Sequence, residues 1–342
     1  MKIGEIYFIQ ERERASGKLT GNVKIGMVGE KGESANRLRQ HQTGNPRDLV
    51  LHHVTETPSP FWVENGLHQR LNASRVRNEW HKLEGNELEN AVNLAESLAA
   101  ETFIHIPFID EELRLRTCVS NGLMIEPSDE STDWHLRLSR AKTKLDRTDE
   151  LRANYKRIIG GMSKEKVEQA QQEDLFYIEH YTVVKFDEDG FSKKYPDLLA
   201  EFTKTTTATS GRLTPKYVEL AVSEIDPNLE LFSQEFMSLC EKVTRQEAEF
   251  SELYELESTI QVFDEIFSWE KEVSTAHLAT VCGLASGIKD QLTWNRSEKS
   301  IQTLDKDLLE SDHPSEYNEF ITAEMKTRQK TRKRARRSIA HN

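Results

Sequence analysis

The chain has 342 residues, of which 36% are hydrophobic and 30% are charged. This composition excludes an intrinsically disordered chain, and the length favours two or three domains over one. No run of about 18 apolar residues occurs, which excludes a membrane-spanning helix. The opening residues enter a strand that contains Glu5, which argues against a secretory signal peptide.

The net charge of −12 conceals two basic parts on either side of an acidic middle. Residues 1–83 carry 13 Lys and Arg against 9 acidic residues, and residues 326–337 carry 8 basic residues and no acidic one. Such asymmetry is typical of chains whose basic parts bind nucleic acid. A solvated acidic helical body with a basic tail is the alternative. Cys118, Cys240 and Cys282 form no metal motif and are odd in number, which favours the cytoplasm.

The first 83 residues predict a small α+β domain, because short runs of β-branched and aromatic residues alternate with helical patterns. Ser34 is expected to be a helix N-cap, and Gly44 and Pro46 are expected to stop that helix. The elements expected, in chain order, are strands at 3–10 and 22–28, a helix from Ser34 to about Thr43, a strand at 48–56, a helix at 57–74 and a closing segment at 75–83.

Beyond residue 84 the sequence predicts a mainly α-helical region with few strands. The Thr-rich segment 203–215 is of low complexity and is interpreted as a linker, so the expected domains are 1–83, 84–204 and 212–342. No internal repeat is evident. Helices are expected at 86–103, 133–160, 164–180, 214–224, 228–271, 274–292 and 315–338, and strand-like pieces at 118–126 and 181–186.

Five short motifs follow one another in residues 1–83. They are Gly4-Glu5-Ile6-Tyr7, Lys24-Ile25-Gly26, Arg37 with His41, Glu64 within FWVENGLHQRL, and NEWHKL at 78–83. Together they resemble the motifs of the GIY-YIG nuclease family, in the phage-derived branch in which KIG stands for YIG. The resemblance implies a three-stranded antiparallel sheet flanked by helices. It also implies phosphodiester hydrolysis with one divalent metal ion, Mg²⁺ or Mn²⁺.

The resemblance matches Arg37 to a catalytic arginine and Glu64 to a metal ligand. A guanidinium is a planar fork of donors that suits phosphate oxygens. One carboxylate suffices for Mg²⁺, which keeps most of its waters. His41 could donate to the phosphate or carry a proton, because histidine titrates near neutrality. For each of these residues an ordinary surface role is the alternative.

Tyr7 and Lys24 complete the expected catalytic set, but the general base stays open. In the wider family the second motif has a tyrosine where this chain has Lys24. Lysine serves as a base only when burial or a nearby cation lowers its pKa. Otherwise Lys24 contacts phosphate and Tyr7 orients the water, or Tyr7 is simply a packed strand residue.

Several further residues are expected to bind substrate. Glu79 falls where relatives have an asparagine that braces the site, and Arg39 is a candidate for backbone contact. In the tail, Lys326, Arg332, Lys333 and Arg334 are expected to bind phosphates without sequence preference. The histidines His52, His53, His68 and His81 could suggest zinc instead. They form no H-x-x-x-H pair and have no cysteine partner, which argues against a zinc site.

The sequence thus predicts a cytoplasmic, metal-dependent endonuclease acting on double-stranded DNA, with phage defence as an analogy only. The C-terminal region is expected to recognise a target, to control the nuclease or to join copies of the chain through its helices. Two alternatives stay open. One is a non-catalytic nucleic-acid-binding module with a nuclease fold, and the other is a helical scaffold with a vestigial nuclease domain.

Overall fold

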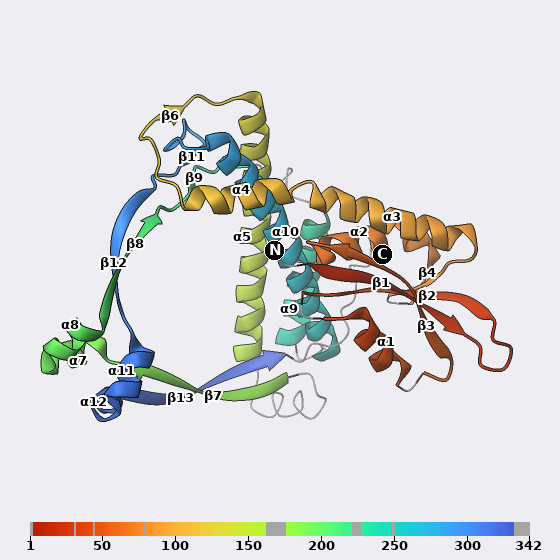
Figure 1. Ribbon diagram of the computed structural model, residues 1–342. Coiled ribbons are helices and arrows are strands. Elements are labelled where there is room, and N and C mark those ends of the chain that lie inside the picture. Colours follow the sequence, from red (N-terminus) through yellow and green to blue (C-terminus); the bar gives the residue numbers. More distant parts are fainter. Residues whose placement is uncertain are drawn as a thin grey trace.

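The structure is a computed structural model, and it describes residues 3–331 except for residues 31, 44, 78, 162–175, 221–226, 246, 248 and 249. Helices make up 54% and strands 25%, so the protein is of mixed α/β type. The N-terminal sheet and its helices lie at one end of the molecule, a pair of long helices crosses the middle, and two β-ribbons reach out on the far side (Figure 1).

An antiparallel sheet of five strands forms the base of the N-terminal domain, where the sequence predicted three. The strands are β1 (Gly4–Arg12), β2 (Leu19–Val28), β3 (Asp48–Thr57), β4 (Arg75–Arg77) and β5 (Trp80–Lys82), in the order β3-β1-β2-β5-β4. The closing segment supplies both additional strands, since β5 pairs with β2 and β4 pairs with β5. Three-residue strands are too short to show a recognisable alternation in the sequence.

Three helices cover the two faces of this sheet. α2 (Pro60–Arg70) and α3 (Asn86–Phe103) pack on one face, and α1 (Ser34–Gln42) lies on the other (Figure 1). Successive strand residues point to opposite faces. Ile6 and Phe8 are therefore buried against α2 and α3, whereas Tyr7 and Ile9 lie on the face that α1 covers.

α3 contributes to the core of the N-terminal domain although it lies beyond residue 83. Its residues Leu88, Ala91 and Leu98 share one buried cluster with Val63 of α2. The motifs end at residue 83, which is why the sequence placed the domain boundary before this helix. The boundary itself stays a prediction.

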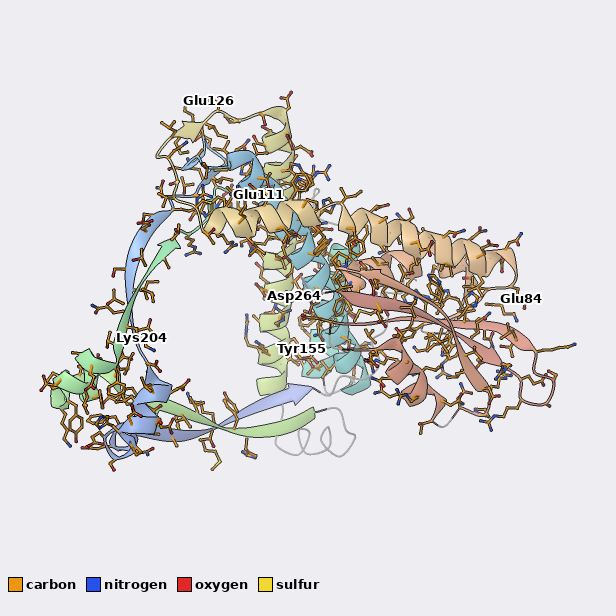
Figure 2. All side chains as sticks on the ribbon, in the orientation of Figure 1. Glu84, Glu111, Glu126, Tyr155, Lys204 and Asp264 are labelled. Carbon is orange, nitrogen blue, oxygen red and sulfur yellow. The ribbon has the colours of Figure 1, made fainter. Side chains whose placement is uncertain are left out.

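Two long helices, α5 (Asp129–Gly160) and α10 (Phe250–Cys282), pack along each other in the middle of the molecule, and Tyr155 and Asp264 mark them in Figure 2. α4 (Ile106–Arg116) packs against α10, and α9 (Pro227–Thr244) packs against both long helices. Trp62 of α2 packs on this helical core and on the core of the N-terminal domain, so α2 joins the two. None of the described helices is long and apolar enough to cross a membrane.

The remaining strands form a small sheet and two ribbons. The sheet holds β6 (Met124–Ile125), β10 (Gly287–Ile288), β11 (Leu292–Thr293) and β9 (Thr214–Pro215). One ribbon pairs β8 (Thr203–Ser210) with β12 (Ser297–Leu304), and the other pairs β7 (Phe176–Phe186) with β13 (Ile321–Thr331). The ribbons meet at a tip of four short helices on the left of Figure 1, and Lys204 marks β8 in Figure 2. These helices are α7 (Glu188–Lys194), α8 (Pro196–Phe202), α11 (Lys306–Asp312) and α12 (Pro314–Glu319).

The ribbons overturn part of the predicted C-terminal architecture. The supposed linker 203–215 begins with β8, because threonine is β-branched and suits an extended chain. The helix predicted at 315–338 is α12 followed by β13 in its described part. The helices predicted at 164–180 and 214–224 fall partly outside the described residues, and their described parts contain β7 and β9. The region 212–342 is therefore not helical throughout.

The tip consists of two copies of one strand–helix–helix–strand unit, β7-α7-α8-β8 and β12-α11-α12-β13. In both, an aspartate caps the first helix, a proline begins the second and a phenylalanine ends it, at Asp187, Pro196 and Phe202 and again at Asp305, Pro314 and Phe320. The backbone N–H of each aspartate donates to the carbonyl of the other unit's phenylalanine at 2.9 Å, so the copies interlock. So few residues recur that the sequence shows no repeat.

Candidate active site

The ring of Tyr7 lies across strand β2, and this explains the glycine of the second motif. Tyr7 pairs with Gly26 in the sheet and is 3% exposed. A Cβ atom on residue 26 would lie 2.4 Å from the Tyr7 hydroxyl oxygen. Only glycine therefore leaves room for this ring.

The Tyr7 hydroxyl and His41 Nε2 form a hydrogen bond of 3.2 Å between β1 and α1. Burial raises the pKa of Tyr7 well above its ordinary value. Burial likewise lowers the pKa of His41 to about 4, assisted by the charges of Lys24 and Arg37. Near pH 7 the phenol therefore keeps its proton and the imidazole is neutral, so Tyr7 donates to His41 Nε2 in the tautomer whose proton is on Nδ1.

The structure brings five of the predicted site residues into one electrostatic environment around Tyr7. After burial, the charges of Glu79 and Glu64 raise the pKa of Tyr7, and the charge of Arg37 lowers it. The charges of Lys24 and Arg37 both lower the pKa of His41. α1 thus supplies Arg37 and α2 supplies Glu64 to the surroundings of the Tyr7 hydroxyl.

Lys24 and Glu79 form a buried ion pair beside this site. The two residues are 5% and 7% exposed, and Lys24 Nζ contacts Glu79 Oε2. The carbonyl of Glu79 also accepts a hydrogen bond of 3.0 Å from the backbone N–H of Ile25, which holds the start of β5 against β2. The Lys24 ammonium is therefore buried and held by a carboxylate. This contact leaves it poorly placed to act as a general base.

Arg37 and Arg39 are exposed residues of α1. Arg37 Nη1 donates to Gln40 Oε1 at 3.0 Å, and its charge reaches both Tyr7 and His41. No interaction places Arg39 at the tyrosine among the described residues. Its predicted contact with the substrate backbone stays a prediction.

Glu64 suits the way in which Mg²⁺ binds proteins. No three His, Cys, Asp or Glu side chains of the described residues gather into a site that could hold a metal ion by themselves. Mg²⁺ keeps several waters and takes other oxygens from a substrate phosphate, so one carboxylate fits it.

The carboxylate of Glu5 is bound to the beginning of α1. Glu5 Oε2 accepts hydrogen bonds from the backbone N–H of Ser34 at 2.9 Å and from its hydroxyl at 2.5 Å. The sequence predicted Ser34 as the N-cap, but α1 begins at Ser34 and Glu33 is the N-cap residue. No role was predicted for Glu5, because this contact joins residues far apart in the chain.

A buried histidine pair lies behind the site. From the sequence its two residues were considered only as possible zinc ligands, and the contact between them was not predicted. His68 of α2 and His81 of β5 are fully buried, and their Nδ1 and Nε2 atoms are 2.9 Å apart. Burial lowers the pKa of His81 to about 4 and that of His68 well below its ordinary value. The pair joins the helix of Glu64 to the strand that follows Glu79.

This pair is expected to make stability fall in acid. The folded state disfavours imidazolium, whereas the unfolded chain takes up protons near pH 6.5, so stability is complete above that pH and declines as the pH falls toward 4. Chemical denaturation between pH 8 and 4.5 should show a steeper decline for the natural protein than for a His68→Leu/His81→Phe variant. Replacing the exposed His52 by alanine should leave the slope intact, and equal slopes in all three proteins would contradict the prediction.

The basic tail lies apart from the site as far as it is described. Lys326 belongs to β13, and its Nζ lies 3.3 Å from Glu324 Oε2. Arg332, Lys333 and Arg334 lie outside the described residues. The structure does not bring Lys326 together with Tyr7, and binding of phosphates by the tail stays a prediction.

Residues 4–96 match the family model of the T5orf172 domain, a family associated with phage-type endonuclease-like domains. No curated protein and no solved structure matches the chain. The match begins with β1 and ends within α3, so it covers the five-stranded sheet, α1 and α2 but neither the long helices nor the ribbons. The N-terminal part of the chain is similar to a T5orf172 domain, which favours a nuclease-like or nucleic-acid-binding role.

Proposed function

We propose that the N-terminal domain is an endonuclease of the GIY-YIG type that hydrolyses phosphodiester bonds in double-stranded DNA with Mg²⁺ or Mn²⁺. The observation that carries this proposal is the hydrogen-bonded pair of Tyr7 and His41, with Arg37 and Glu64 acting on the same hydroxyl. The similarity of residues 4–96 to an endonuclease-associated family supports it. Cytoplasmic defence against phage is the setting we propose by analogy.

The pair of Tyr7 and His41 supplies a path for the proton of an attacking water. A water that donates to the phenol oxygen of Tyr7 is linked through the phenol proton to His41 Nε2. With a pKa of about 4, this imidazole is a weak base in the unliganded protein. A bound phosphate would raise the pKa of His41, because a nearby anion favours imidazolium. Substrate binding thus makes His41 a stronger base when it is needed.

Arg37 and Glu64 have complementary tasks in this mechanism. The exposed guanidinium of Arg37 can grip two oxygens of the scissile phosphate and relieve charge in the transition state. Glu64 would hold the metal ion, which supplies charge stabilisation at the phosphate and the leaving oxygen when bound. Lys24, neutralised by Glu79, would keep β2 and β5 in register beneath the site.

Incubation with supercoiled plasmid DNA tests the proposal. We expect cleavage with Mg²⁺ and none with EDTA, and a loss of about a hundredfold or more in Glu64→Gln, because the amide is a much weaker metal ligand. Glu89→Gln, on the exposed surface of α3, is the matched control and should cleave normally.

Absence of cleavage with both Mg²⁺ and Mn²⁺ would contradict an endonuclease.

A non-catalytic binding module is the second candidate. The observation that favours it is the ion pair of Lys24 with Glu79, because Lys24 stands in the position where the wider family has a tyrosine. Tight DNA binding without cleavage is its expected outcome. A gel-shift titration of the same plasmid fragments separates the two functions.

A further inference from the structure

The N-terminus of α1 is capped from outside the helix. The first N–H groups of any helix have no partner within it, and they attract negative charge. Glu33 occupies the N-cap position, but its side chain makes no capping hydrogen bond in the described helix. Glu5, on strand β1, binds the backbone N–H and the hydroxyl of Ser34 instead, and Ser34 is 2% exposed.

The Glu5–Ser34 contact lies on the same face of β1 and on the same side of α1 as the functional side chains of this strand and this helix. Glu5 and Tyr7 are two residues apart on β1 and so point to the same face of the sheet. Ser34, Arg37 and His41 follow at intervals of three and four residues and so lie along one side of α1. Strand and helix are therefore joined at two points, Glu5 to Ser34 and Tyr7 to His41, with Arg37 between them.

We propose that Glu5 is a positioning residue, whose carboxylate holds the beginning of α1 so that Arg37 and His41 face Tyr7. The proposal rests on the proposed function of the site, since it assigns Glu5 to that reaction. Glu5 itself would contact neither DNA nor metal and would act through α1.

The sheet gains nothing evident from a glutamate at this position. Glu5 lies directly opposite Glu56 in the pairing of β1 with β3, and like charges in opposite positions destabilise a sheet. Removing the Glu5 carboxylate relieves that repulsion while it frees the helix terminus. The net change in stability should therefore be small, and the main effect should fall on the geometry of the site.

The other end of α1 has its own attachments. Gln42 accepts a hydrogen bond of 2.8 Å from the backbone N–H of Leu49 and donates one of 2.9 Å to the carbonyl of Arg47. Leu38 packs against the buried cluster of Tyr7 and Ile9. Loss of the Glu5 contact should therefore loosen the first turns of α1, which carry Arg37, and leave the helix in place.

The test compares Glu5→Ala, Glu5→Gln and the matched control Glu33→Ala. We expect Glu5→Ala to lower kcat for plasmid cleavage by roughly ten- to a hundredfold, with little change in KM, because small displacements of catalytic groups cost about this much. Glu5→Gln retains an acceptor oxygen for Ser34 and should recover most of the rate. Glu33→Ala should behave like the natural protein, and all melting temperatures should stay within a few degrees.

Amide hydrogen exchange supplies a readout that needs no cleavage. In Glu5→Ala the amides of the first turns of α1 should exchange at least tenfold faster, while those near Gln42 stay protected. Unchanged exchange in α1 would overturn the proposal even if the protein cleaves DNA. If the natural protein proves inactive but Glu5→Ala still exchanges faster in α1, the Glu5–Ser34 contact holds the helix as proposed and the endonuclease function is rejected. Equal cleavage rates in Glu5→Ala and the natural enzyme would also overturn the positioning role of Glu5.

Discussion

Replacing Arg37 by alanine is expected to slow DNA cleavage by about a hundredfold or more, because one preorganised donor at a developing charge contributes about 3 kcal/mol to transition-state stabilisation. The side chain is exposed, and its single described hydrogen bond goes to the neighbouring Gln40. Folding should therefore be nearly unaffected. Single-turnover cleavage of a labelled duplex, together with a melting curve, measures both effects.

Two variants sharpen the result for Arg37. Arg37→Lys keeps the charge but loses the planar fork of donors, so it should recover only part of the rate. Arg114→Ala removes another exposed guanidinium, from α4, where it binds Glu111, and should cleave at the natural rate. If Arg37→Ala cleaves as fast as Arg114→Ala, the guanidinium has no part in the reaction.

Local patterns in the sequence were enough to predict most of the N-terminal domain. The alternation in residues 3–10 is reproduced by β1, and the helix predicted from Ser34 is α1. Such elements follow from periodicity and stop signals within a few residues. The short motifs also led to the cluster around Tyr7, because residues of one motif share one strand or one helix face.

The C-terminal strands could not be predicted in the same way. β8 and β12 pair across more than eighty residues, as do β7 and β13. Residues 181–186 of β7 were predicted to be strand-like, whereas β8 was interpreted as a linker and β13 as part of a helix. Thr203–Ser210 suits a strand through its β-branched threonines, but only the partner strand makes that preference decisive. A β-ribbon exposed on both faces lacks the hydrophobic alternation that identifies a strand.

Contacts within the site were hidden for a similar reason. The pairing of Lys24 with Glu79 and the capping of Ser34 by Glu5 join residues far apart in the chain. A single sequence shows which charged residues are present but not which of them are buried together. The structure alone therefore changes Lys24 from a candidate base into one half of a buried ion pair.

That ion pair carries the second large expected effect. Lys24→Met or Glu79→Leu alone should lower the free energy of unfolding by about 3–5 kcal/mol, because each leaves an uncompensated charge in the core. The double variant Lys24→Met/Glu79→Leu leaves no buried charge and should recover most of the loss. Denaturant unfolding of all four proteins gives the coupling energy directly, and simple additivity of the two losses would contradict a buried pair.

The same double variant decides what Lys24 does in the reaction. If Lys24 only keeps β2 and β5 in register, the stable double variant leaves Tyr7, Arg37 and Glu64 in place. It should then cleave DNA within about tenfold of the natural rate, which is a change of about 1.4 kcal/mol or less in the barrier. If Lys24 contributes its charge to the scissile phosphate, the double variant should fold normally and lose about a hundredfold in rate, as Arg37→Ala does. Because the engagement of Lys24 by Glu79 leaves its ammonium no free approach to a phosphate, we expect the first outcome.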